Sequence, residues 1–347
     1  MTFYDVYYKN GKIYIGKTSR LSRMQIKDVF KRYKQDLQTV EQNLEQHYGS
    51  YITLIPEITN HIIHSGGKRL RPLLLMITSD LCDYKGDRRY GIAAVLEFLH
   101  TASLLHDDVI DLADTRRGKT AANHIWGNSA SILVGDYLYS QAFKLMIQDG
   151  DPLVQKILTN AAITMVEGET AQLTKCGDIS ITEEEYLRVI EQKTAILISA
   201  ACAMGAILAK APQEHIEALS QFGMNLGIAF QVTDDTLDYV ATEEEFGKAI
   251  GKDLQEGNIT LPLIRTLHMC SAAEADSIKT TLENIDSDGN DMIEIMSLLN
   301  KYQGIDYALN EASNYIKDGK MFLERFEDSE PKNALLAMSD YIVGRRL

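Results

Sequence analysis

Two short acidic clusters contain the residues of this sequence that are best suited to chemistry. Both read D-D-x-x-D, one over residues 107–111 and the other over residues 234–238. Side chains four residues apart share a helix face, so the outer carboxylates of each cluster would stand side by side and repel each other. One cluster could be a solvated helix end, but two copies, each ending an apolar run, predict divalent-cation binding. The acidic residues are Asp107, Asp108 and Asp111 in the first cluster and Asp234, Asp235 and Asp238 in the second.

A site built from carboxylates alone selects hard cations. Mg²⁺ is usually held by one or two carboxylates, keeps several waters and is completed by substrate phosphates. The clusters therefore predict a phosphorylated substrate bound together with Mg²⁺.

Basic segments near the acidic clusters agree with that substrate class. Residues 66–72 read GGKRLRP, and residues 114–119 read DTRRGK just after the first cluster. The planar guanidinium of arginine suits bidentate contact with phosphate. Either segment alone could be a solvated basic turn. Lys193 and Thr194 interrupt an apolar helix face and should point inward, Gln231 precedes the second cluster, and Lys248 follows it.

The elements that must position these residues are helices. Between residues 187 and 208, apolar or small residues recur at alternating steps of three and four, which is one face of a helix. Breaks rich in Gly, Pro and Asn divide the chain after Met24 into about ten helical segments, with no convincing strand and no linker between domains. The predicted fold is all-α: a single-domain helical bundle of about ten or more helices over residues 24–347.

The first 23 residues differ from the rest. Two short strands are predicted around an Asn10-Gly11 turn. Residues 11–18, GKIYIGKT, match the phosphate-loop pattern, which requires a buried strand before it and a long helix after it. A polar hairpin precedes this match instead, so we expect residues 1–23 to be a dispensable hairpin-like appendage, or an extension from an upstream start codon with Met24 as the functional start. The alternative is a genuine ATP or GTP site.

Composition excludes several classes of protein. The 347 residues include 35 Lys and Arg against 49 Asp and Glu, a net charge of −14, which argues against coating nucleic acid or an anionic membrane. The four cysteines are far apart and lack zinc-site spacing, which is typical of free thiols in a reducing cytoplasm. No run of 18 apolar residues and no apolar signal core occur. We expect a cytoplasmic protein without a transmembrane segment.

Taken together, the motifs resemble the trans-type polyprenyl diphosphate synthases of the all-α isoprenoid synthase fold. The resemblance covers residues 65–262 and, more loosely, the chain from Met24 to its end. Near the first acidic cluster the amino-acid sequence is most similar to bacterial octaprenyl-type enzymes. The matching stretches are GGKRLRP (66–72), HTASLLHDDVIDLADTRRG (100–118), GDYLYSQAF (135–143), EGETAQ (167–172), QKTA (192–195), FQVTDDTLDY (230–239) and GKAIGKDLQEGNITLPL (247–263).

The resemblance implies a role for each candidate residue. Asp107 and Asp111 would hold Mg²⁺ against the allylic diphosphate, and Asp234 and Asp238 would hold a further ion from the opposite wall. It further implies a central cavity, a homodimer, and peripheral membrane contact during product release. The implied contacts to the allylic diphosphate are Arg116, Lys193, Thr194, Gln231 and Lys248, and those to isopentenyl diphosphate are Lys68, Arg71, His100 and Arg117. From spacing alone, His100 could equally be a core histidine.

The implied reaction needs no nucleophilic side chain. Metal ions and basic residues neutralise the leaving diphosphate, the double bond of isopentenyl diphosphate attacks the allylic cation, and a proton is lost to the released diphosphate. The cation must be kept from water, so the cavity beyond the clusters should be dry and apolar.

Product length depends on the residues deeper along the first cluster's helix. Ala102 and Ser103 precede Asp107, and in this family small residues here leave the tunnel open, which favours a long, octaprenyl-like product for quinone side chains. Close helix packing would explain the same small residues. The alternatives are a short-chain farnesyl or geranylgeranyl synthase, and a non-catalytic subunit, which should have lost a motif. A terpene cyclase would not require GGKRLRP.

Overall fold

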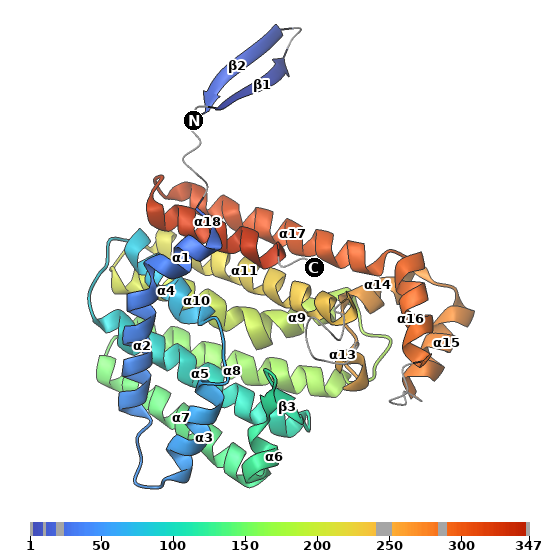
Figure 1. Cartoon of the computed structure of the whole chain (residues 1–347), viewed down its shortest axis with the longest axis horizontal. Helices are drawn as coiled ribbons and strands as arrows, with labels where there is room; N and C mark the ends of the chain where they lie inside the picture. Colours follow the sequence, from blue (N-terminus) through green and yellow to red (C-terminus); the bar gives the residue numbers. More distant parts are fainter. Residues whose placement is uncertain (1–2, 10–11, 19–23, 241–251, 284–289, 345–347) are drawn as a thin grey trace.

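The computed structural model describes residues 3–9, 12–18, 24–240, 252–283 and 290–344. Helices make up almost all of the part from residue 24 onward (Figure 1). In chain order they are α1 (Ile26–Arg32), α2 (Lys34–His47), α3 (Leu54–Ile63), α4 (Leu70–Leu81), α5 (Arg88–Ile110), α6 (Ala122–Trp126), α7 (Asn128–Asp149), α8 (Pro152–Lys175) and α9 (Glu183–Ile190). There follow a π-helix η1 (Glu191–Ala195), α10 (Ile196–Leu208), α11 (Gln213–Val240), α13 (Lys252–Gln255), α14 (Leu261–Met269), α15 (Ala272–Glu283), α16 (Asn290–Lys301), α17 (Gly304–Phe322), the 3₁₀ helix η2 (Leu323–Arg325) and α18 (Glu330–Val343). The all-α prediction is confirmed.

Local sequence explains where several of these helices begin. Asp151 caps α8 by accepting hydrogen bonds from the backbone N–H groups of Leu153 and Val154, and Pro152 occupies the first helical position. Thr182 and Glu185 form a reciprocal capping box at the start of α9. These are the positions at which Pro, Gly, Asp and Thr break the apolar periodicity, so the sequence breaks and the helix boundaries have the same cause.

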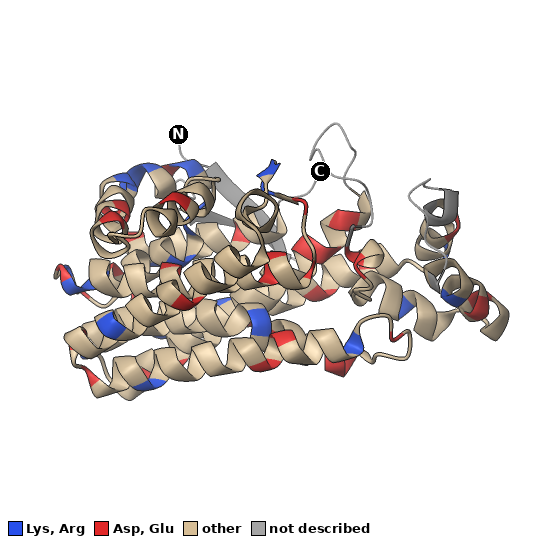
Figure 2. Cartoon of the chain, turned by 90° about the horizontal axis from the view of Figure 1, so that it is seen from below, with Lys and Arg blue, Asp and Glu red and all other residues tan. Residues whose placement is uncertain are grey.

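The hydrophobic core is centred on α10. Its residues from Leu197 to Leu208 are all buried, and it packs against α4, α5, α8 and α11. The stretch Glu183–Leu208 is long and apolar enough to cross a membrane, but 72% of its apolar window lies inside the protein, as in a core helix. Figure 2 shows that charges of both signs are interspersed over the surrounding helices.

Two small hairpins complete the fold. The strands β1 (Phe3–Lys9) and β2 (Lys12–Thr18) pair antiparallel with Lys9 opposite Lys12, as predicted for an Asn-Gly turn. Residues 12–18 are therefore a paired strand, whereas a phosphate loop must leave a strand and enter a helix. Figure 1 shows this hairpin standing away from the helical body.

The prediction of no strand after Met24 was wrong. The strands β3 (Thr115–Arg116) and β4 (Lys119–Thr120) form a two-residue hairpin directly after the first acidic cluster. Such short strands escape detection by periodicity, because two residues cannot display an alternating pattern. Arg117 at the turn has a φ of 52°, and Gly118 follows with a φ of 75°, which together produce the reversal.

Candidate active site

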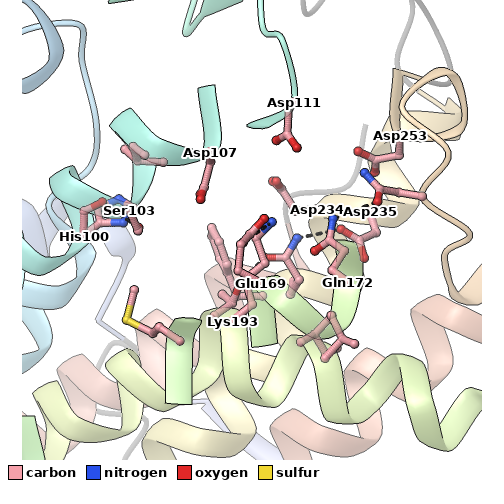
Figure 3. Close-up of a pocket in the computed structure, with 18 of the residues that line it drawn as sticks. His100, Ser103, Asp107, Asp111, Glu169, Gln172, Lys193, Asp234, Asp235 and Asp253 are labelled. Carbon is pink, nitrogen blue, oxygen red and sulfur yellow. Dashed lines mark hydrogen bonds and ion pairs between the residues drawn. The ribbon is translucent and has the colours of Figure 1, made fainter. Parts of the chain in front are cut away.

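A cavity of about 820 Å³ opens among α4, α5, α8, α9, η1 and α11. It brings together both acidic clusters and both basic segments, although they lie far apart in sequence. Figure 3 shows Asp107 and Asp111 together on one side, with Asp234 facing them from the other side. The predicted residues on its wall are Lys68, Arg71, His100, Ser103, Asp107, Asp111, Arg116, Arg117, Lys193, Thr194, Gln231, Asp234, Asp235 and Asp238. Lys248 lies outside the described residues.

The first acidic cluster ends α5. Asp107 and Asp111 both line the cavity, and the backbone N–H of Asp111 donates to the carbonyl of Asp107 at 2.8 Å. Burial raises the pKa of Asp107 to about 7, although the positive charge of Lys193 opposes this shift. Burial raises the pKa of Asp111 as well. Burial thus disfavours the ionised forms of these two carboxylates, and the charges of Lys193 and Arg116 only partly offset it.

Asp108 departs from the predicted role. Its side chain is buried and is absent from the wall of the large cavity, and its Oδ1 accepts a hydrogen bond from Nε of Arg116 at 2.7 Å. Adjacent residues of a helix point about 100° apart, so Asp108 can be turned away from the face that Asp107 and Asp111 share. Asp108 thus holds Arg116 in place, while Asp107 and Asp111 face the cavity.

The second acidic cluster lies near the end of α11. Asp235 accepts hydrogen bonds from the Tyr186 hydroxyl at 2.6 Å and from Nε2 of Gln231 at 2.7 Å. Burial raises the pKa of Asp235 to about 7, against the lowering effect of these two bonds. Asp238 accepts from the backbone N–H of Asp253 at 2.9 Å, which ties α11 to α13. The cluster is therefore fixed by neighbours on both sides.

The acidic walls have the donor chemistry of a divalent-cation site. All the groups concerned are carboxylate oxygens, which hard cations prefer, and burial has raised several of their pKa values. Among the described residues, no three His, Cys, Asp or Glu side chains come close enough to form a complete cage by themselves. Such an arrangement fits ions that are shared with the phosphates of a ligand, as Mg²⁺ commonly is.

Another part of the cavity wall is strongly basic. Arg69 donates to Glu97 at 2.7 Å and to the carbonyl of Ile63 at 2.8 Å. Burial lowers the pKa of Arg71 to about 10, and Nε of Arg71 is buried without a hydrogen-bond partner among the described residues. Burial, followed by the charge of Arg71, holds the pKa of His100 well below its usual range. An anion would supply the missing partner and the missing negative charge.

The β3–β4 hairpin carries two further arginines of the cavity wall, Arg116 and Arg117, and is fixed to the segment before α4. Arg117 donates to the carbonyl of Gly66, and Lys119 donates to the carbonyl of His64 at 3.0 Å. The backbone before α4 must approach Arg117 closely: a Cβ on Gly67 would lie 2.7 Å from Nη1 of Arg117. Gly67 is therefore needed for this close approach, and both glycines of GGKRLRP adopt positive φ angles that favour glycine.

The π-helix η1 delivers Lys193 and Thr194 to the cavity. Its backbone packs closely against two glycines, Gly168 and Gly227. A Cβ added to Gly168 would lie 2.6 Å from the backbone N of Lys193, and a Cβ added to Gly227 would lie 2.5 Å from Cα of Ala195. Short π-helical segments often mark functional sites. This one inserts a wider turn where α8, α9 and α11 meet.

Both side chains from η1 are held by partners. Lys193 pairs with Glu169 at 2.8 Å. Burial alone would lower the pKa of Lys193, but the carboxylates of Asp107 and Glu169 outweigh it and raise the pKa. The Thr194 hydroxyl donates to Oε1 of Gln231 at 2.9 Å, so a chain of hydrogen bonds links η1 to the second acidic cluster.

Apolar side chains line the rest of the cavity, among them Leu104, Met165, Val166, Ile190 and Phe230. Ser103 lies on this wall, and its hydroxyl donates to the carbonyl of His100 at 2.9 Å. Ala102 is fully buried in the hydrophobic core and does not line the cavity. The pair predicted to border a tunnel is therefore split between the cavity wall and the core.

Sequence reasoning missed several residues of the cavity wall. Glu169 and Asp253 stand within the stretches 167–172 and 247–263, but neither had been given a role. Tyr186, Glu97 and Tyr341 also line the cavity. An acidic residue among apolar neighbours on a buried helix could have pointed to Glu97. Nothing local marks Tyr341, since it comes from the last helix of the chain.

Comparisons with known proteins agree with this geometry. The sequence model of the family described as Polyprenyl synthetase matches residues 52–299. The chain is 37% identical over 312 residues to octaprenyl diphosphate synthase of Escherichia coli (strain K12), covering 90% of this chain and 96% of that protein.

Solved structures show the same likeness. A decaprenyl diphosphate synthase from Rhodobacter capsulatus has a TM-score of 0.88 and 38% identity, covering 92% of this chain and 99% of that one. A polyprenyl synthase from Caulobacter crescentus CB15, complexed with calcium and isoprenyl diphosphate, has a TM-score of 0.88 and 35% identity, covering 94% and 99%.

Proposed function

Because this chain belongs to the polyprenyl synthetase family, we propose that it is the transferase that elongates an allylic prenyl diphosphate with isopentenyl diphosphate to a long all-trans product. One observation carries this proposal. Two facing acidic clusters, an apolar surface, and a basic wall with a buried guanidinium nitrogen that has no partner in the described parts of the chain all border one cavity. This combination suits two diphosphates and a hydrocarbon chain at the same time.

The acidic side of the cavity is proposed to bind the allylic diphosphate. Asp107, Asp111, Asp234 and Asp238 would hold two or three Mg²⁺ ions, whose positive charge stabilises the leaving diphosphate. Arg116, fixed by Asp108, and Lys193, fixed by Glu169, place further positive charge at the same diphosphate. Thr194, Gln231 and Lys248 complete the proposed contacts.

The basic side is proposed to bind isopentenyl diphosphate through Lys68, Arg71, His100 and Arg117. With its pKa held low, His100 is neutral at physiological pH and can hydrogen-bond without adding charge. Loss of the allylic diphosphate leaves a cation, which the double bond of the second substrate attacks. The departing diphosphate accepts the proton that restores the double bond. The apolar wall excludes water from the cation.

The product is proposed to be octaprenyl-like, by analogy with the relatives. The small side chain of Ser103 leaves the apolar part of the cavity open beneath Asp107. We propose that the product leaves at a membrane surface, since Ile110 on the cavity wall and the adjoining Leu112 are both exposed. The four cysteines are free, in keeping with the proposed cytoplasmic location.

Product analysis tests the function directly. With farnesyl diphosphate, isopentenyl diphosphate and Mg²⁺, we expect the chain to form long polyprenyl diphosphates, with formation abolished by a chelator. A farnesyl or geranylgeranyl product would favour a short-chain synthase, and the absence of any product would favour a non-catalytic subunit. The same assay on residues 24–347 should yield the same products if residues 1–23 are dispensable.

Gly67→Ala should weaken isopentenyl diphosphate binding in particular. The added Cβ would displace the Arg117 guanidinium, a charge-assisted donor, and we expect the KM for isopentenyl diphosphate to rise about tenfold. Gly66→Ala is the matched control: its φ is also positive, at 102°, but nothing lies within 4 Å of the added Cβ. Steady-state kinetics with each substrate varied in turn would detect the difference, and equal effects of both variants would remove Arg117 from this pocket.

We further propose that the enzyme is a homodimer joined through α7 and α8. These neighbouring helices expose large apolar side chains that no other described element covers: Leu133, Phe143 and Ile147 on α7, and Ile163 and Leu173 on α8. A patch of this kind is unusual on a monomer. A second copy presenting the same patch would bury it symmetrically.

Light scattering of two variants tests this interface. Ile163→Arg should convert a particle of twice the 38.9 kDa chain mass into a monomer, because the arginine would be buried without a partner. Met321→Arg on α17, with 54% of its surface exposed, is the control and should leave the dimer intact. A dimer that persists in Ile163→Arg would exclude this face.

A further inference from the structure

Lys68 is an exposed cation of the basic wall, and the C-terminal helix holds it. The loop between α3 and α4 carries Lys68, which is exposed. Its ammonium donates to the hydroxyl of Tyr341 and stands 4.7 Å from the centroid of the Tyr341 ring. Arg69, Arg116 and Arg117, in contrast, are tied to a carboxylate or a backbone carbonyl.

Tyr341 reaches the cavity from the other end of the chain. It lies on α18, which packs against α4, and it is part of the cavity wall. The separation of 273 residues means that the position of Lys68 depends on the docking of the last helix. No acidic residue intervenes in this contact, so the charge of Lys68 remains unneutralised by it.

The chemistry of the pair leaves donors free for an anion. An ammonium has three N–H donors, and one of them is used by the tyrosine oxygen. Since that oxygen accepts, the phenolic proton can still be donated. The ring also lies close to the ammonium without carrying an opposing charge. Tyr341 thus restricts a flexible side chain while keeping its charge and two of its donors available.

We propose that Tyr341 is a positioning residue that orients Lys68 toward the diphosphate of the isopentenyl substrate. The inference rests on the proposed function of the basic wall and adds α18 to the site. It assigns no chemistry to the tyrosine. It predicts that Tyr341 matters for binding of one substrate only, and only while Lys68 is present.

Steady-state kinetics of four variants tests this role. We expect Tyr341→Phe, which keeps the ring, to raise the KM for isopentenyl diphosphate about twofold to threefold, and Tyr341→Ala to raise it about five- to tenfold. The turnover number and the KM for farnesyl diphosphate should change less than about twofold. In a Lys68→Ala background, Tyr341→Ala should add nothing further, because the two residues act as a unit.

Tyr307→Phe is the matched control. The Arg265 guanidinium lies 4.5 Å from the centroid of the Tyr307 ring, and the Tyr307 hydroxyl donates to Glu183 at 3.0 Å, but Tyr307 does not line the cavity. Its kinetics should match those of the unaltered chain. Melting temperatures of all variants would separate a folding defect from a binding defect.

The possible results distinguish this inference from the proposed function. If Lys68→Ala leaves the KM for isopentenyl diphosphate unchanged, the assignment of the basic wall fails. If Lys68→Ala raises that KM but Tyr341→Ala does not, only the positioning role fails. A lower KM in Tyr341→Phe, or effects of Tyr341→Ala and Lys68→Ala that simply multiply, would also overturn it.

Discussion

Asp107→Asn is expected to lower the turnover number about a thousandfold while leaving the fold intact. The substitution keeps the shape of the side chain but removes a charge that faces Asp234 across the cavity. Losing about 4 kcal/mol of charge stabilisation in the transition state corresponds to roughly this factor. The melting temperature should stay the same or rise, because the charges of Glu169 and Asp111 disfavour ionisation of Asp107. The measurement is turnover at saturating substrates and Mg²⁺, together with thermal unfolding.

Asp234→Asn, on the facing wall, should behave in the same way. Asp318→Asn on α17 is the control: it removes an exposed carboxylate that does not line the cavity, and its activity should be unchanged. Near-normal turnover in both cavity variants would contradict the assignment of the acidic clusters to cation binding.

Ser103→Tyr is expected to shorten the product to a farnesyl or geranylgeranyl length. Ser103 faces the cavity, so the new ring would fill the space beneath Asp107 through which the product grows. Asp107 lies one turn further along α5 and would keep its position, so the first condensations should proceed. Mass analysis of the products and the melting temperature would be measured together.

Ala102→Tyr provides the matched comparison on the same helix. Ala102 is fully buried in the core, so a tyrosine there must displace packed side chains. We expect this variant to be destabilised by about 1–3 kcal/mol and to lose all activities together. A stable Ser103→Tyr enzyme that still makes the full-length product would show that the chain grows along another wall.

Local sequence was sufficient to predict the helices and to recognise the acidic and basic motifs. Apolar spacing and capping residues predict the helices because both depend on neighbours within about one turn. The two D-D-x-x-D clusters could be recognised for the same reason: the alignment of Asp107 with Asp111 is a property of the helix itself. The N-terminal hairpin also followed from its Asn-Gly turn and agrees with the observed register.

The roles of individual residues within those motifs depended on contacts between distant segments. Asp108 belongs to the first motif, but packing against the β3–β4 hairpin pairs it with Arg116. Ala102 and Ser103 are equally small in the sequence, and only the arrangement of α5 against its neighbours puts one in the core and the other on the cavity wall.

The sequence by itself thus determined the fold class, the helices and the acidic and basic motifs, since these depend on residue type and short spacing. The tertiary structure decided how the motifs are joined. Gly168 and Gly227 hold the π-helix that carries Lys193, and α18 brings Tyr341 to Lys68 across 273 residues. Such contacts arise from the burial of apolar faces between helices, which can be any distance apart in the chain. They therefore leave no local pattern in the sequence.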